Sequence, residues 1–222
     1  MIKAKGVSLR FPNGTIAINN IDLQVEPGDM VYVTGPSGSG KTSLLKLFMG
    51  IEYPTIGSLE VLGQQMDKGQ TSRIRQLRTS IGPVFQEFKL IKGRTVAENV
   101  MLGMRFLDLS QDQLKENAHD ALAKVGLEHK ASSLVENLSW GESQRVAIAR
   151  AVARKPLLIL ADEPTGNLDK DNAINILELF KSFIDQKTSV IITTHATHLI
   201  DAEKHCKLIQ MNKGSLSWER LG

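Results

Sequence analysis

Residues 35–42 read G-P-S-G-S-G-K-T, and this string constrains the fold more than any other part of the chain. It follows an apolar, β-branched run at 30–34 and precedes an apolar pattern of helical spacing at 44–48. A glycine-rich loop between a strand and a helix gathers backbone N–H groups at a helix N-terminus, where the helix dipole favours anions. The motif therefore predicts a phosphate-binding loop in an α/β nucleotide-binding fold.

Each residue type in this loop has a physical role. Glycines permit backbone conformations that a Cβ would obstruct. Lys41 places a positive charge on the β- and γ-phosphates, so we expect it to act in catalysis as well as binding, and the Thr42 hydroxyl is a ligand for Mg²⁺. The residues predicted to hold the nucleotide here are Gly35, Pro36, Ser37, Gly38, Ser39, Gly40, Lys41 and Thr42.

Composition and charge exclude several classes of protein. Of the 222 residues, 41% are hydrophobic and 23% are charged, and the formal net charge is +3. No apolar run approaches the roughly 20 residues that span a bilayer, and the first residues lack the apolar core of a signal peptide. The single cysteine, Cys206, excludes an internal disulfide and fits a reducing compartment. We expect a cytoplasmic protein that reaches a membrane only through a partner.

The densest basic stretch lies at 68–78. We interpret it as a solvated loop and helix face, with a contact to lipid headgroups or an acidic partner as the alternative. Aromatic residues do not interleave with these charges, so nucleic-acid binding is not expected.

Short apolar runs and helical patterns alternate along the chain. Helices are predicted at 111–125, where Ser110 and Gln113 form a capping box, and at 171–185. The second helix is expected to bury Ile174, Leu177, Phe180, Phe183 and Ile184. Strands are predicted at 2–7, 21–25, 30–34, 58–62, 81–85, 157–160, 189–193 and 207–211.

The balance of these elements changes twice. Strands dominate residues 1–86, helices dominate 87–154, and strand–helix alternation resumes at 155. We predict one domain, with a nucleotide-binding core at 1–86 and 155–222 and a helical subdomain at 87–154.

A second polar cluster consists of Asp162 and Glu163. These residues follow the apolar run L-L-I-L at 157–160, with one alanine between the run and the cluster. Asp162 is expected to hold Mg²⁺, and Glu163 to polarise an attacking water as general base. Gln86 and His195 also follow predicted strands, so we expect Gln86 in the Mg²⁺ shell and His195 on the γ-phosphate. The guanine-reading string N-K-x-D is not matched, since residues 212–215 read N-K-G-S, which we interpret as a turn after the last strand.

Residues 138–145 read L-S-W-G-E-S-Q-R and precede another helical pattern. Ser139 and Glu142 have the spacing of a capping box, so Ser139 is the expected N-cap. The start of this helix is therefore a second predicted anion site.

In this order, the motifs resemble those of ABC-type ATPases, the nucleotide-binding subunits of membrane complexes, over nearly the whole chain. The resemblance implies a P-loop NTPase fold, with a RecA-like core, a small antiparallel β region and an inserted helical subdomain. It identifies residues 35–42 as the Walker A loop, 157–163 as Walker B and 138–142 as the signature. Gln86 corresponds to the Q-loop, residues 166–169, which include Asp169, to the D-loop, and His195 to the switch histidine. Phe11 corresponds to the aromatic residue that stacks on adenine.

The family's mode of action follows from the resemblance. It implies ATP and Mg²⁺ as ligands, and a dimer of ATPase subunits, identical or different, in which Ser139 and Gly141 of one chain contact the γ-phosphate held by the other. It also implies an integral membrane permease as partner, reached through residues 87–91, and a place on the cytoplasmic face of the inner membrane. The strings D-E-P-T-G-N-L-D and V-F-Q-E-F-K-L resemble those of a subgroup of cell-division, lipoprotein-release and efflux ATPases. The compact length is most similar to the cell-division and lipoprotein-release types, and we slightly favour the cell-division type.

The chain departs from the family pattern at Trp140, which replaces the first glycine of the signature. We expect dimerisation on ATP to persist, with turnover that is slow or dependent on the partner. An alternative is a nucleotide-gated structural clamp with little turnover. A soluble ABC ATPase that works on DNA or ribosomes is disfavoured, since coiled-coil arms, zinc sites and a tandem second cassette are missing.

Overall fold

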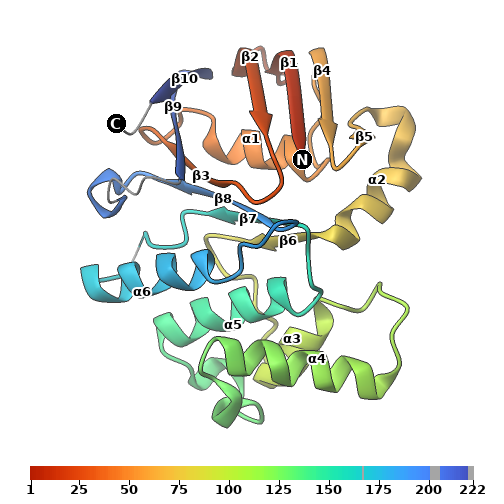
Figure 1. The fold of residues 1–222 in the computed structure, drawn as a ribbon, viewed down its shortest axis with the longest axis vertical. Coiled ribbons are helices and arrows are strands. Elements are labelled where there is room, and N and C mark those ends of the chain that lie inside the picture. The colour runs from red at the N-terminus through yellow and green to blue at the C-terminus, as the bar shows by residue number, and fades with distance from the viewer. Residues whose placement is uncertain (167, 201–205, 220–222) are drawn as a thin grey trace.

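The structure, a computed structural model, describes residues 1–166, 168–200 and 206–219. A four-stranded antiparallel sheet with the order β2-β1-β4-β5 forms one layer (Figure 1). Its strands are β1 (Ile2–Arg10), β2 (Ile16–Val25), β4 (Ile56–Val61) and β5 (Gln64–Gln65). This sheet is the small antiparallel region that the family resemblance implied.

A six-stranded sheet with the order β10-β9-β3-β8-β7-β6 forms the second layer. Five of its strands are parallel, and β10 returns antiparallel to β9. Since the carboxyl ends of parallel strands meet at one edge, the segments after β3, β6, β7 and β8 converge there. The strands are β3 (Met30–Thr34), β6 (Ile81–Val84), β7 (Leu158–Asp162), β8 (Ser189–Thr194), β9 (Cys206–Asn212) and β10 (Ser215–Glu219).

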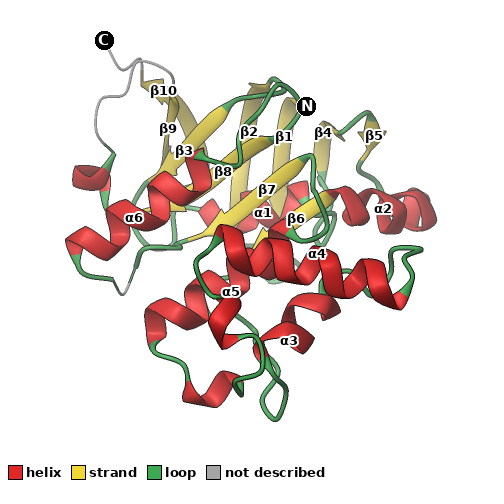
Figure 2. Ribbon diagram, turned by 60° about the horizontal axis from the view of Figure 1, so that its bottom comes forward, coloured by secondary structure: helices red, strands yellow, loops and turns green. Residues whose placement is uncertain are grey.

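Helices cover both faces of the parallel sheet (Figures 1 and 2). Alternate residues of β3 belong to different cores: Met30 and Tyr32 pack with the helical part, and Val31 and Val33 with the antiparallel sheet. This alternation is what a strand buried on both faces requires. The helices are α1 (Lys41–Phe48), α2 (Thr71–Leu77), α3 (Val96–Leu102), α4 (Gln111–Lys124), α5 (Trp140–Val152) and α6 (Lys170–Lys181).

Helices α3, α4 and α5 pack on one another at the end of the molecule opposite the antiparallel sheet (Figure 1). The capping box predicted for α4 is present, with the Ser110 and Gln113 side chains each bonded to the other residue's backbone N–H. No helix within the described ranges has the length and apolar character needed to cross a bilayer. The division of the chain at 86/87 and 154/155 stays a prediction.

Two expectations from the sequence are wrong in detail. The helix predicted at 171–185 ends at Lys181. Leu177 and Phe180 are buried as predicted, but Ile174 is 38% exposed, because Ala173 and Ile176 complete the buried stripe of α6 in its place. The string at 212–215 does not follow the last strand. It forms the turn between β9 and β10, where Lys213 and Gly214 both have positive φ, the conformation of a tight hairpin.

Candidate nucleotide site

The phosphate-binding loop lies between β3 and α1, as predicted. Gly35 and Gly40 are required by their surroundings, since both have positive φ and little space for a side chain. A Cβ would lie 2.2 Å from the Met211 carbonyl oxygen at Gly35 and 2.4 Å from the Ala17 carbonyl oxygen at Gly40. The loop is thus pressed against β2 and β9, and these contacts fix the path of its backbone.

Lys41 is the first residue of α1, and its side chain is only 7% exposed. Its ammonium donates to the carbonyl oxygens of Gly35 (2.8 Å) and Pro36 (3.2 Å). It also pairs with the Glu163 carboxylate, with Nζ 3.3 Å from Oε1. The loop therefore curls around a fixed positive charge, the arrangement that a phosphate-binding loop needs.

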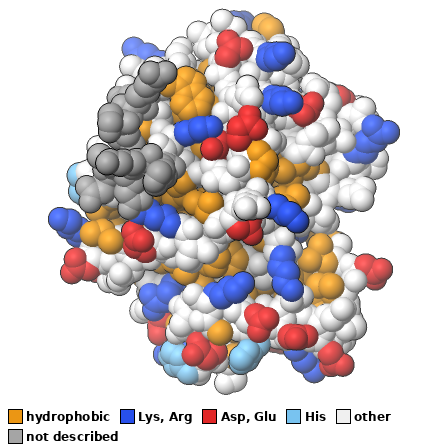
Figure 3. All heavy atoms as spheres, viewed as in Figure 1, with side chains coloured by type: hydrophobic (Ala, Val, Ile, Leu, Met, Phe, Trp, Pro, Cys, Tyr) orange, Lys and Arg blue, Asp and Glu red, His pale blue; other side chains and the backbone are white. Residues whose placement is uncertain are grey.

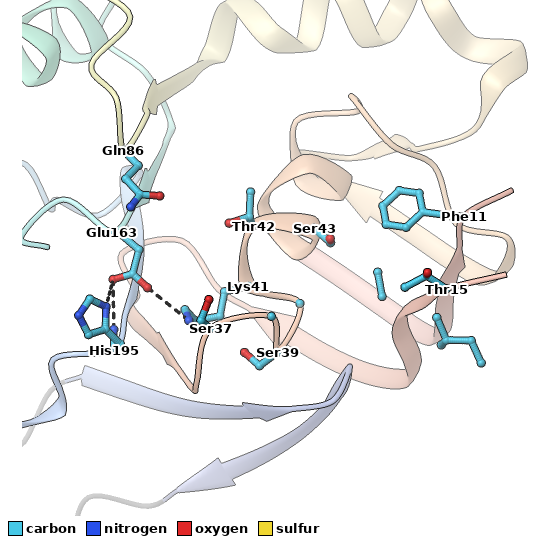
Figure 4. Close-up of a pocket in the computed structure, with 14 residues that line it drawn as sticks. Phe11, Thr15, Ser37, Ser39, Lys41, Thr42, Ser43, Gln86, Glu163 and His195 are labelled. Atoms are coloured by element: carbon cyan, nitrogen blue, oxygen red, sulfur yellow. Dashed lines mark hydrogen bonds and ion pairs between the residues drawn. The ribbon is translucent and has the colours of Figure 1, made fainter. Parts of the chain in front are cut away.

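A pocket of about 570 Å³ opens beside this loop. Figure 4 shows Phe11 and Thr15 at one end, and Glu163, His195 and Gln86 at the other, with the loop and the start of α1 between them. One end is thus partly apolar and the other carries charge, which suits a ligand with an aromatic base and an anionic tail. The lining residues are Phe11, Thr15, Ile16, Ala17, Ser37, Gly38, Ser39, Gly40, Lys41, Thr42, Ser43, Gln86, Glu163 and His195.

The two adjacent carboxylates after β7 diverge. Asp162 accepts a hydrogen bond from the Thr42 hydroxyl at 2.9 Å and one from Thr193 Oγ1 at 2.6 Å. Glu163 has a φ of 46°, in the left-handed region, and its backbone N–H bonds the Thr193 carbonyl oxygen at 3.1 Å. Its carboxylate faces Lys41 on one side and His195 Nδ1, at 2.8 Å, on the other. Each acid can therefore serve a different function.

The side chains around Asp162 fit a magnesium ion. The Thr42 hydroxyl and the Asp162 carboxylate lie within hydrogen-bond distance of each other. Thr42 and Gln86 both line the pocket, and Asp162 lies behind Thr42, outside the lining. All three offer oxygen atoms, which are the ligands that Mg²⁺ prefers, and a nucleotide's phosphates supply the remainder.

The helix start that we predicted as a second anion site is the capped N-terminus of α5. Ser139 is the N-cap, Trp140 the first helical residue and Gly141 the second. The Glu142 N–H donates to Ser139 Oγ at 3.2 Å, and the Ser139 N–H donates to Glu142 Oε2 at 2.8 Å. This last bond is the main cause that holds the pKa of the Glu142 carboxyl below its ordinary value.

The indole of Trp140 leaves the cap intact because it turns aside. It packs edge-on against the ring of Phe88, with centroids 4.5 Å apart and planes at 69°. Phe88 and Lys89 both have positive φ, and the Arg150 guanidinium from α5 donates to both of their carbonyl oxygens. The segment after Gln86 therefore contacts α5 twice, through the Phe88–Trp140 ring pair and through the hydrogen bonds of Arg150.

Not every predicted site residue reaches the pocket. Ser139, Gly141 and Asp169 are absent from its lining. Gly35 and Pro36, at the start of the loop, and Asp162, at the end of β7, are also absent from the lining. Asp169 is the N-cap of α6, where the backbone N–H of Asn172 donates to its carboxylate at 2.9 Å and lowers its pKa. Within the predicted D-loop, Asn167 lies outside the described residues.

Sequence reasoning missed Thr193, which is fully buried and bonds both to Asp162 and to the backbone of Glu163. A threonine inside a β-branched strand carries no signal of this role. Thr15, Ile16 and Ala17 were missed as well, because the end of the β1–β2 turn and the start of β2 meet the loop only in the folded chain.

Comparison with known proteins gives a consistent result. The family described as ABC transporter matches residues 18–166. The cell division ATP-binding protein FtsE of Escherichia coli K12 is 38% identical over 216 residues, which cover 97% of both chains. FtsE of Streptococcus pneumoniae is 36% identical over 215 residues, which cover 96% of this chain and 93% of that protein.

Solved structures agree with these matches. A dimeric post-hydrolysis state of the ATP-binding cassette MJ0796, bound to ADP and Pi, has a TM-score of 0.88 and 31% identity, covering 100% of this chain and 99% of that one. CbiO1 of Clostridium perfringens, part of the ABC transporter complex cbiONQ, has a TM-score of 0.87 and 28% identity, covering 97% and 86%.

Proposed function

Because the chain belongs to the ABC transporter family, as an ATP-hydrolysing subunit similar to FtsE, we propose that it is the motor of a membrane complex. Two copies, or this chain and a related ATPase subunit, close around two Mg-ATP molecules. Closure and reopening drive a conformational change in an integral membrane permease. The protein is held at the cytoplasmic face of the inner membrane by that partner alone.

The observation that carries this proposal is that the groups proposed to bind phosphate lie in two separate places. One set surrounds Lys41 in the pocket, and the other is the capped start of α5, whose residues Ser139 and Gly141 do not line that pocket. A second chain that brings its own α5 to the pocket would complete the site. The 31% identical cassette MJ0796 is described as dimeric with ADP and Pi, which supports this arrangement.

The hydrolytic step follows from the positions of the side chains. Lys41 stabilises the charge on the β- and γ-phosphates, and Phe11 stacks on the adenine at the other end of the pocket. A water attacks the γ-phosphorus as Glu163 takes its proton, and the bond to the ADP oxygen breaks. His195 holds the Glu163 carboxylate at 2.8 Å and contacts the γ-phosphate. When Mg²⁺ is bound by Thr42, Asp162 and Gln86, it neutralises phosphate charge.

The partner docks beside the segment that follows Gln86. Phe88 and Leu90 are half-buried there, and Ile91 is exposed. Next to the helical part, a groove of about 730 Å³ is lined by Arg75, Arg78, Arg154 and Phe106, which is 84% exposed, among other residues. Figure 3 shows hydrophobic and basic side chains next to one another across the middle of the molecule in that view. A permease segment with an apolar surface and carboxylates fits such a groove.

The similarity to FtsE along the full chain favours a partner and a role in cell division over lipoprotein release or efflux. The cargo or task is set by the permease. The clamp alternative differs from the motor in one respect: in a clamp, ATP binding suffices and turnover is dispensable.

The test is a Glu163→Gln variant, which keeps the shape of the side chain and removes the base. We expect its ATPase rate to fall by about 10²- to 10⁴-fold. With saturating Mg-ATP, light scattering should show a dimer, and without nucleotide a monomer. If the variant stays strictly monomeric with saturating Mg-ATP, even beside the permease in a bilayer, the proposal is wrong. If cells that carry only this variant divide normally, the clamp replaces the motor.

A further inference from the structure

The carboxylate of Glu142 lies at the end of α5 that the proposed function brings to a triphosphate. Its Oε2 accepts the Ser139 N–H, and its Oε1 lies 3.3 Å from the ammonium of Lys130. Lys130 belongs to a single 3₁₀ turn, Glu128–Lys130, that precedes α5 in the chain. Among the described residues, Lys130 is the one cation paired with this carboxylate.

An unpaired carboxylate at this place would oppose the binding of a phosphate. The Ser139 hydroxyl accepts the Glu142 N–H, so its own proton is left to donate outward. A negative charge one helical turn from that hydroxyl repels an approaching anion, and the repulsion grows as the closing dimer excludes water. The lowered pKa of Glu142 keeps the carboxylate ionised at neutral pH, so protonation does not relieve the repulsion.

The position of Lys130 is fixed by the backbone around it. Its N–H donates to the Leu127 carbonyl oxygen at 3.0 Å, and the next residue, Ala131, accepts from the Ala97 N–H of α3 at 2.9 Å. The Glu142 side chain is 19% exposed and that of Lys130 35%, so the pair is partly shielded from water. Arg145 extends the positive potential, since its Nη1 lies 3.9 Å from where a Cβ on Gly141 would be.

We propose that Lys130 is a positioning residue of the ATPase cycle. By pairing with Glu142, it cancels the charge of the capping carboxylate and holds the capping box in place, so that Ser139 and Gly141 can receive the γ-phosphate bound by a second chain. This inference rests on the proposed function. It assigns Lys130 no contact with the nucleotide, because its effect passes entirely through Glu142.

The experiment is a set of charge variants of the full chain, assayed for steady-state ATP hydrolysis and for binding of a fluorescent ATP analogue. We expect Lys130→Met to lower kcat about five- to tenfold, while KM and analogue affinity stay within about twofold, because binding to the chain's own loop does not need α5. Lys130→Arg retains most of the rate. Lys115→Met, which removes an exposed charge from α4, is the matched control and keeps the parent rate.

The decisive comparison introduces Lys130→Met into a chain that already carries Glu142→Gln. Glutamine still fits the capping box but carries no charge, so in this background we expect Lys130→Met to change kcat by less than about twofold. An equal loss in both backgrounds, or a Lys130→Met variant as fast as the parent, overturns the inference. Thermal unfolding of each variant excludes a simple loss of folded protein.

Failure of the inference is distinguishable from failure of the proposed function. If the ATP-saturated Glu163→Gln chain dimerises and Lys130→Met is as fast as the parent, the inference alone is wrong. If the Glu163→Gln chain stays monomeric even beside the permease, the proposed function is wrong and this inference falls with it.

Discussion

The contact between Trp140 and Phe88 allows a quantitative test of how α5 is joined to the segment after Gln86. The rings meet edge-on at 4.5 Å, a geometry whose energy exceeds that of the buried area by about 0.5–1.5 kcal/mol. Trp140 is 37% exposed, so Trp140→Leu also gives up roughly 50 Å² of buried apolar area, or about 1 kcal/mol. We therefore expect Trp140→Leu to cost about 1.5–2.5 kcal/mol of unfolding free energy.

The assay is a double-mutant cycle with Phe88→Leu, measured by guanidinium unfolding followed by far-UV circular dichroism. If the rings stabilise each other, the cost in the double variant falls short of the sum of the single costs by about 1 kcal/mol. Trp218→Phe, a substitution of the exposed tryptophan on β10, is the control and should add independently. Costs that add within about 0.3 kcal/mol would refute an energetic link between the rings.

The same pair makes a functional prediction. Since Trp140 ties the start of α5 to the segment where the permease is proposed to dock, it should slow turnover or make it depend on that partner. Trp140→Gly, assayed with the permease present, should differ from the natural chain in ATPase rate. Equal rates would remove Trp140 from any role in coupling.

Two further predictions follow from the hydrogen bonds at the two proposed phosphate-binding sites. The folded-state pKa of Glu142 lies below 4.5, so its ionised form stabilises the fold above that pH, and the contribution is lost as the pH falls through the lowered value. Glu142→Gln should therefore be less stable than the natural chain at pH 7, and urea unfolding should show the difference shrinking between about pH 5 and 3; a constant difference contradicts this. Thr42→Val removes a proposed Mg²⁺ ligand, so the Mg²⁺ concentration for half-maximal ATPase activity should rise about tenfold. Thr42→Ser keeps the hydroxyl and is the conservative control, and both variants should lose all activity in EDTA. An unchanged Mg²⁺ requirement in Thr42→Val excludes the ligand role.

The parts of the fold that the sequence predicted well are those set by neighbours in the chain. The capping boxes at Ser110 and Ser139 depend on contacts three residues apart, and the structure confirms both. The phosphate-binding loop is equally local, because a strand, six loop residues and a helix specify it. Patterns of this kind are complete within a short stretch of sequence and need no knowledge of strand order.

The features that were missed depend on distant contacts or on weak local signals. Thr193 bonds Asp162 across two neighbouring strands, so its role follows from the pairing of β7 with β8. The end of α6 was placed too late because Phe183 and Ile184 continue an apolar spacing beyond Lys181. The hairpin at Lys213 and Gly214 did carry a local signal, since a glycine in a short polar turn before alternating apolar residues is typical of a hairpin.

The arrangement around Glu163 links the phosphate-binding lysine to the proposed base. Lys41 pairs with one carboxylate oxygen of Glu163, and His195 Nδ1 lies 2.8 Å from the other, so both oxygens of the proposed base have a partner. A triphosphate offers Lys41 several negative oxygens in place of one carboxylate, and its arrival would free Oε1 to accept a proton from water. On the proposed function, Lys41 therefore has two effects when ATP binds. Its ammonium stabilises the phosphate charge, and because it leaves the Glu163 carboxylate to do so, it also frees the proposed base.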